Sequence, residues 1–314
     1  MSSGSSSSSF GPLSDADAQA LYLAGRDTAQ DAFGVIWETM LISAYGVFFA
    51  VAIYSIFQNG LRSRGSIALL FAIVSLYASS LTLWVLGVAT WFENTHLAFM
   101  NDPSIPLTDR KALVNDNFHR LDTQRIALYL FNMMVGDSVV IWRAWVLYPR
   151  ALWVLSLPCI LLLISFSFGV VNVICTFALD IHNLALPDDG RVCSHSDVSW
   201  AFSLATNVSC TILIGYRAWQ HRRTMKSLDI VGQSRGMSAD KVLSILVESG
   251  FIYCFLWLTQ VMNFINVSRN TPIIYIDLFS VGLGHQISGM YPTLIISIVN
   301  FSKKPFGRPT LSAP

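Results

Sequence analysis

Residues 67–92 read IALLFAIVSLYASSLTLWVLGVATWF and contain no charged side chain. A helix needs about 20 predominantly apolar residues to cross the hydrocarbon core of a bilayer, so this stretch predicts a transmembrane helix. Six further stretches meet the same criterion, at 33–57, 126–147, 152–179, 200–216, 242–265 and 275–299. The sequence therefore predicts an all-α polytopic membrane protein built as a bundle of seven transmembrane helices.

The composition agrees with a multi-pass membrane protein and argues against several other classes. Only 12% of the 314 residues are charged and 53% are hydrophobic, whereas a soluble domain has about 25% charged residues. A net charge of +1 gives no basis for nucleic-acid binding. The chain has no recognisable catalytic set, metal-ligand spacing or nucleotide motif, so we expect no enzyme activity, no cofactor and no metal.

The distribution of Lys and Arg predicts the orientation of the chain in the membrane. With the N-terminus outside, the cytosolic segments hold twelve of these residues and the outer segments hold seven. Because positive residues favour the cytosolic side, we expect an N-terminus outside and a cytosolic C-terminus. The plasma membrane is favoured over internal membranes as the location.

Three regions follow from this topology. Residues 1–32 predict a disordered, Ser-rich extracellular tail, residues 33–300 the seven-helix transmembrane domain, and residues 301–314 a short basic cytosolic tail. The segment 93–124 predicts a long outer loop, in which 108–121 has the spacing of an interfacial helix. The third inner loop, 217–241, is basic and is a candidate contact for a cytosolic signalling protein.

Four polar residues fall near the middle of three predicted spans: Asp137, Asn207, His285 and Gln286. Polar groups that face lipid are costly, so these side chains are expected to point inward and to share one polar site or water-filled cavity. Two interpretations stay open. The residues either form hydrogen bonds that hold the bundle together, or they form a binding site for a ligand, an ion or a proton.

Two opposite charges lie at similar depth near the cytosolic end of the bundle. Arg143 lies about one turn from the end of its span, and Glu248 lies about two turns inside the end of another span. One hypothesis is an ion pair that ties these two helices at the inner face. The alternative is that Arg143 reaches lipid phosphates and that Glu248 bonds elsewhere.

The last span and the outer cysteines each leave two readings. Pro292 lies inside the seventh span, where a proline removes one helical hydrogen bond, and it marks either a fixed kink or a hinge.

Cys175 lies near the outer end of the fourth span and Cys193 lies in the loop that follows. They form either a disulfide in an oxidising compartment or a pair of free thiols.

Several motifs resemble one known family. The stretch NMMVGD (132–137) is followed by IWRAW (141–145), and ATN (205–207) runs to YRAWQHRR (216–223). VESG (247–250) then runs to YC (253–254), and YPTLII spans 291–296. In this order they resemble a large, uncharacterised family of seven-helix membrane proteins from mushroom-forming fungi. The resemblance covers spans three, five, six and seven, and it implies the topology without an activity.

Three functional classes remain. The first is a receptor-like protein that senses an extracellular or membrane-borne ligand, either a small molecule or a lipid. The second is a transporter or lipid-handling protein that uses the midplane polar residues as its site. The third is a non-catalytic structural membrane protein. Seven helices alone are a fold-level analogy and do not decide between them.

Overall fold

The computed structural model describes residues 14–59, 64–101, 105–148, 152–182, 198–227, 234–260 and 267–302. Within these ranges the protein is all-helical and has no strand. The α-helices within these ranges are α1 (Asp15–Asn59), α2 (Arg64–Thr95), α3 (Leu107–Leu147), α4 (Ser156–His182), α6 (Ser199–Ser227), α7 (Ser234–Thr259) and α8 (Ile274–Ser302). A π-helix, His96–Met100, follows α2, and a 3-10 helix, Leu152–Leu155, precedes α4.

In the part of the chain that the structure describes, four helical segments are long and apolar enough to cross a membrane. They lie at Asp15–Gln58, Gly65–Met100, Thr123–Leu147 and Trp153–Phe177. A shorter apolar segment occupies Ser244–Thr259 of α7. The fold is therefore that of an all-helical membrane protein.

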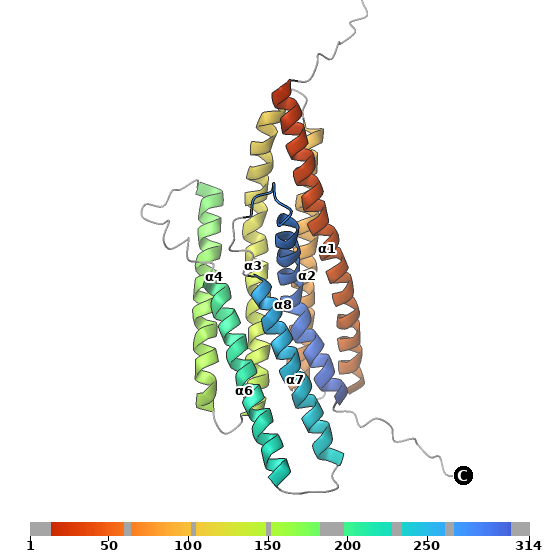
Figure 1. Ribbon diagram of the computed structural model, residues 1–314, viewed down its shortest axis with the longest axis vertical. Coiled ribbons are helices and arrows are strands. Elements are labelled where there is room, and N and C mark those ends of the chain that lie inside the picture. Colours follow the sequence, from red (N-terminus) through yellow and green to blue (C-terminus); the bar gives the residue numbers. More distant parts are fainter. Residues whose placement is uncertain are drawn as a thin grey trace, which may run out of the picture.

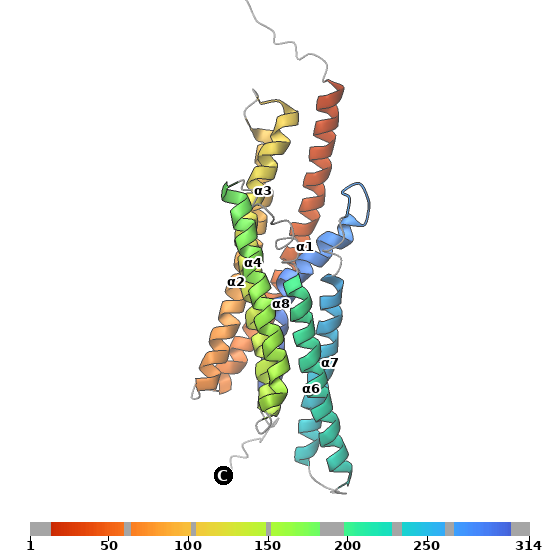
Figure 2. The same cartoon turned by 90° about the vertical axis from the view of Figure 1, so that its left-hand side faces the viewer.

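The helices run along one long axis and alternate in direction (Figure 1). As a result, α1 begins at one end of the bundle and α8 finishes at the other. The third helix is central, because it contacts α2, α4, α6 and α8. The most extensive pairing joins α1 to α8, and the view in Figure 2 shows α6 and α7 side by side.

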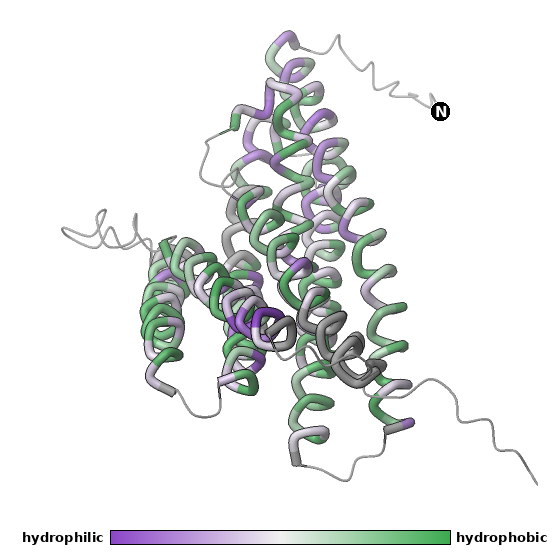
Figure 3. The backbone as a smooth tube through the Cα atoms, turned by 60° about the horizontal axis from the view of Figure 1, so that its bottom comes forward, coloured by the Kyte–Doolittle hydropathy of each residue, from purple (hydrophilic) through white to green (hydrophobic). Residues whose placement is uncertain are grey.

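Apolar side chains cover the outside of the bundle, and many polar side chains lie inside. Phe71 is 74% exposed and Phe255 is 67% exposed, whereas Asn132, Asp137 and Gln286 are 0% exposed. Figure 3 shows hydrophobic residues along the length of the helices and hydrophilic residues concentrated at the end where α1 begins. This distribution suits a protein whose solvent is lipid, because exposed apolar groups then cost nothing.

The first helix begins much earlier than the sequence indicated. Residues 15–32 belong to α1, so the prediction of disorder over 1–32 is wrong from Asp15 onward. Ser14 explains the early start. Its hydroxyl accepts a hydrogen bond from the Asp17 amide at 3.2 Å and donates one to the Asp17 carboxylate at 2.8 Å, which is the arrangement of a helix N-cap. Residues 1–13 lie outside the described ranges.

The predicted outer loop is also mostly helical. Instead of a loop over 93–124, α2 continues to Thr95, the π-helix follows, and α3 already begins at Leu107. The helical spacing recognised at 108–121 is therefore the first part of α3 and not a separate interfacial helix. The 45 residues of α1 correspond to about 68 Å at 1.5 Å per residue. Because a bilayer core is about 30 Å thick, α1 extends well beyond it.

Candidate functional site in the bundle interior

Asp137 and Asn207, which the sequence placed at similar depth, are in direct contact. The Asn207 side-chain amide donates to one oxygen of the Asp137 carboxylate at 2.6 Å, and the Ser203 hydroxyl donates to the other oxygen at 2.6 Å. All three side chains are almost completely buried. Because Ser203 and Asn207 are four residues apart, they lie on the same face of α6. The result is a polar link between α3 and α6.

His285 takes a different partner from the one expected. Its Nδ1 atom lies 2.6 Å from Oε1 of Glu38 on α1, so His285 does not join Asp137 and Asn207 in a single hydrogen-bonded cluster. The reason is the packing of the helices, since α8 lies most extensively against α1. The sequence analysis assigned no role to Glu38, because it could not tell which helix neighbours α8.

Glycines leave room for the buried carboxylate of Glu38. A Cβ atom added at Gly282 would lie 2.9 Å from Cγ of Glu38, and one at Gly87 would lie 3.2 Å from Oε2. The same position at Gly87 is 3.9 Å from Nη2 of Arg125, so the guanidinium of Arg125 lies near this carboxylate. Glu38, His285 and Arg125 thus bring ionisable groups from α1, α8 and α3 together.

Gln286 is buried and has no hydrogen-bond partner for either atom of its side-chain amide among the described residues. Oδ1 of Asn207 likewise has no hydrogen-bond partner among the described residues. Buried amide groups are normally satisfied by protein or by ordered water. The predicted polar residues therefore form two separate groups, Asp137 with Asn207 and His285 with Glu38, while Gln286 keeps its hydrogen-bonding capacity.

A third polar cluster was not predicted from the sequence. The side chain of Asn132 on α3 accepts a hydrogen bond from Ser79 and donates one to Ser80 at 3.1 Å, and both serines are on α2. Nearby, the hydroxyl groups of Tyr45 and Thr293 lie 3.1 Å apart and join α1 to α8. The adjacent serines at 79 and 80, within an otherwise apolar span, were the available signal.

The predicted ion pair between Arg143 and Glu248 is not formed and is corrected here. Glu248 is exposed, and its carboxylate accepts a hydrogen bond from Ser244 at 3.1 Å, one turn earlier on α7. Arg143 is buried and turns to Tyr291 on α8. Its Nη2 lies 3.4 Å from the Tyr291 hydroxyl, and its guanidinium carbon lies 5.4 Å from the ring centroid. Although Arg143 and Glu248 lie at similar depth, they do not form an ion pair, because Glu248 points away from the interior.

The Arg143 contact continues into an aromatic stack. The rings of Tyr291 and Tyr253 are parallel, with an interplanar angle of 6° and centroids 3.9 Å apart. Nε and Nη1 of Arg143 have no hydrogen-bond partner among the residues that the structure describes. This buried guanidinium is therefore held on one side only, where α3, α7 and α8 meet.

Pro292 lies inside α8, which continues on both sides of it. A proline at 292 cannot donate a hydrogen bond to the carbonyl oxygen of Ser288, four residues earlier. Gly136 of α3 packs against this oxygen, since a Cβ added at Gly136 would lie 2.9 Å from it. The proline, expected to mark either a fixed kink or a hinge, thus lies where the backbone of α8 packs closely on Gly136, the residue before Asp137.

The cysteines in the described residues are one disulfide-bonded residue and three free thiols. Cys175 is disulfide-bonded, and its predicted partner Cys193 lies outside the described residues. Cys159, Cys210 and Cys254 are free thiols. Within the described ranges, no group of three or more His, Cys, Asp or Glu side chains is arranged to hold a metal ion.

Comparison of the chain with protein families, with curated proteins and with solved structures finds no match. The contacts between the helices are therefore the basis for assigning a function.

Proposed function

We propose that this chain is a seven-span, receptor-like membrane protein that senses a small-molecule or membrane-borne ligand. In this proposal the N-terminus is outside, the C-terminus is cytosolic, and the plasma membrane is the location. Each of the seven predicted apolar stretches overlaps one of the α-helices. The bias of twelve against seven basic residues supports the orientation.

The resemblance to the fungal seven-helix family supports the same proposal. Its motifs lie in α3, α6, α7 and α8, and they contain side chains that contact one another across the bundle: Asp137 with Asn207, Arg143 with Tyr291, and Tyr291 with Tyr253. If members of the family share a mechanism, the residues of these motifs are expected to contact one another between helices. The family supplies no activity, so the sensing role is argued from the contacts.

The observation that carries the proposal is the environment of Arg143. Burying a charge is costly unless a carboxylate or several hydrogen bonds compensate it, and among the described residues Arg143 has only Tyr291 as a partner. A contact this weak can be exchanged for another partner at little cost. The end of the bundle where Arg143 lies is the predicted cytosolic end, so exchange of this contact would alter the surface presented to a cytosolic protein at 217–241.

A distance measurement tests this role. Spin labels placed at Val146 on α3 and Ile245 on α7, both exposed, would report the separation of these helix ends in the purified protein. Arg143→Gln should broaden the distance distribution or move it to longer values, because the link from α3 to the Tyr291–Tyr253 stack is lost. Arg143→Lys is the matched control that keeps a charge. Identical distributions in the wild type and in both variants would contradict the proposal.

One observation favours a second candidate, a proton-coupled transporter. Glu38, His285 and Arg125 place two acid–base groups and a fixed positive charge close together in the interior, and such groups mark proton pathways in membrane proteins. Proteoliposomes that contain the full chain and a pH-sensitive dye in the lumen would test it. Proton flux that disappears in Glu38→Gln and persists in Arg143→Gln would favour the transporter over the receptor.

A further inference from the structure

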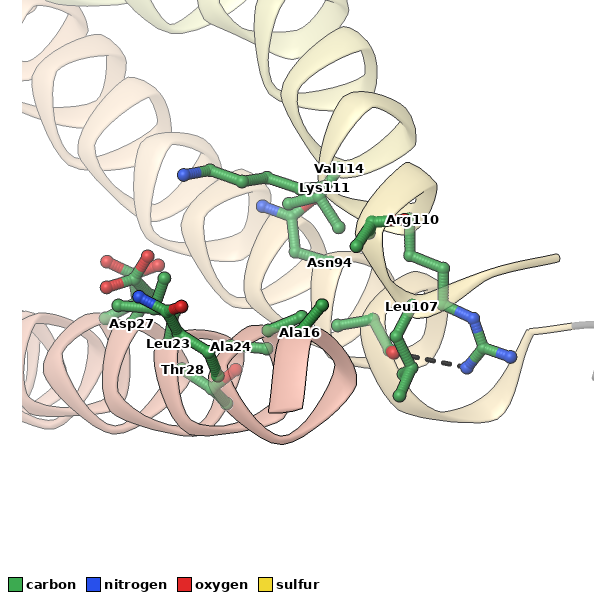
Figure 4. Close-up of a pocket in the computed structure, with 15 residues that line it drawn as sticks. Ala16, Leu23, Ala24, Asp27, Thr28, Asn94, Leu107, Arg110, Lys111 and Val114 are labelled. Atoms are coloured by element: carbon green, nitrogen blue, oxygen red, sulfur yellow. Dashed lines mark hydrogen bonds between the residues drawn. The ribbon is translucent and has the colours of Figure 1, made fainter. Parts of the chain in front are cut away.

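The outer ends of α1, α2 and α3 enclose a cavity of about 370 Å³ (Figure 4). All the residues that line it lie outside the predicted spans, at 16–31 on α1, at 94 and 98 beyond the second span, and at 107–114 on α3. Ligand pockets in proteins have volumes of about 300–1,000 Å³. The cavity is thus large enough for a small ligand and is separate from the polar clusters in the bundle interior.

Small side chains on α1 create the space. Ala16, Ala20 and Ala24 line the cavity at four-residue intervals, so their methyl groups follow one another along the same face of the helix. Leu107 and Val114 of α3, two turns apart, line the opposite wall. The walls therefore offer an elongated apolar surface between two helices.

Most of the charges at the cavity already have partners. One oxygen of Asp27 accepts hydrogen bonds from Arg26 at 2.8 and 3.1 Å, and Asp31 forms an ion pair with Arg269 at 3.0 Å. Arg110 donates to the carbonyl oxygens of Ala98 and Ile105, each at 3.3 Å. These side chains stabilise the outer ends of the helices, and each already has a hydrogen-bond or ion-pair partner without a ligand.

Lys111 differs from the other charged residues of the cavity. It is exposed and forms no hydrogen bond or ion pair with any residue in the described ranges. Figure 4 shows Lys111 and Arg110 leaving α3 in opposite directions, with the Arg110 guanidinium turned toward a backbone carbonyl. The cavity consequently presents one ammonium group that lacks a negative partner, above an apolar surface.

We infer that this cavity binds an amphiphile that has one acidic group, with its carboxylate on Lys111 and its hydrocarbon chain along the alanine face of α1. A cationic ligand is disfavoured, because Asp27 and Asp31 are already paired with arginines. This inference concerns binding at the outer ends of three helices and does not depend on the receptor-like role.

Binding of dodecanoate to the full chain in neutral-lipid nanodiscs, measured by titration calorimetry, tests the inference. Binding should saturate at one site, and Lys111→Gln should weaken it by about tenfold or more, because a hydrogen bond to a charged group contributes about 1.5–3 kcal/mol. Lys111→Arg keeps the positive charge and should retain most of the affinity. Ala20→Leu should abolish binding, because its larger side chain occupies the cavity.

Two controls separate the site from the surrounding bilayer. Dodecanol has the same chain without the charge and should bind at least about tenfold more weakly for the same electrostatic reason. Nanodiscs that contain anionic phospholipid test whether a lipid head group takes the place of the free acid. Competition by the anionic lipid, equal binding of dodecanol and dodecanoate, or unchanged binding in both Lys111→Gln and Ala20→Leu would overturn the inference. Since Lys111 is exposed, the Lys111→Gln variant is expected to fold even if Ala20→Leu does not.

Discussion

At the scale of single residues, the contact between Glu38 and His285 makes the sharpest prediction about stability. A buried polar group that loses its hydrogen-bond partner costs about 1–3 kcal/mol, and more when it is charged, so Glu38→Gln and His285→Gln should each lower the free energy of unfolding. The double variant should cost less than the sum, since the second substitution removes a partner that is already lost. Thermal unfolding in detergent measures all three.

The control for this cycle is Glu248→Gln. Glu248 is exposed and bonds only to Ser244 on its own helix, so its substitution should change stability by no more than about 0.5 kcal/mol. Strictly additive effects of the Glu38 and His285 substitutions would show that the two side chains do not interact in the folded protein.

Asp137 gives a second prediction at this scale. Two donors converge on its carboxylate, from Ser203 and from Asn207, each at 2.6 Å. In Asp137→Asn, the remaining oxygen can still accept from Asn207, but the new NH2 group faces the Ser203 hydroxyl, which must turn to accept from it. Neither hydrogen bond then has a charged acceptor. We expect a loss of about 1.5–3 kcal/mol in unfolding experiments. A variant as stable as the wild type would indicate that these contacts contribute little.

Some of these residue contacts could be predicted from the sequence and others could not. Asp137 and Asn207 were recognised because polar residues are rare in apolar spans, and they meet in the structure. The partners of His285 and Arg143 were not recognised, because depth along a helix does not reveal which helix lies opposite or which way a side chain points. Glu38 was expected to be solvated or capped near the outer end of its span, whereas the packing of α1 against α8 buries it beside His285.

At the scale of helices, the close approach of α3 to α8 depends on Gly136. A methyl group there would lie 2.9 Å from the carbonyl oxygen of Ser288, so the two helices would have to separate. Gly136→Ala should therefore destabilise the protein by about 1–3 kcal/mol, as expected for overpacking. It should also change the distance between spin labels on α3 and α8.

Gly25→Ala is the matched control. Gly25 also lies inside a helix, but an added Cβ atom there would have no neighbour within 4 Å. Alanine is the better helix former by about 0.5–1 kcal/mol, so this substitution should leave stability unchanged or raise it. If Gly136→Ala behaved in the same way, the close packing of α3 on α8 would be contradicted.

The helix scale is where the sequence was most informative and where its error was systematic. Each predicted apolar stretch overlaps a helix, because consecutive residues determine the length and composition of a buried or lipid-facing helix. The early starts of α1 and α3 were missed because hydropathy reports only the apolar part of a helix. The cap at Ser14 and the spacing at 108–121 were the local signals for the polar extensions.

At the scale of the whole molecule, the account requires that the two ends of the chain lie on opposite sides of the membrane. Helices that alternate in direction place the start of α1 and the end of α8 at opposite ends of the bundle (Figure 1). Crossing by all seven helices separates the termini. Crossing by only the four segments that qualify on length and composition would leave both termini on the same side.

The most direct test of this central claim is protease protection of the tagged, full-length chain in sealed membrane vesicles of known orientation. The account predicts that a tag at the N-terminus and one inserted beside Arg269 are accessible from the outer side. Tags inserted at Ser234 and at the C-terminus should be accessible only from the cytosolic side. Accessibility of the N-terminal and C-terminal tags from the same side would contradict the seven-span topology and the proposed function that depends on it.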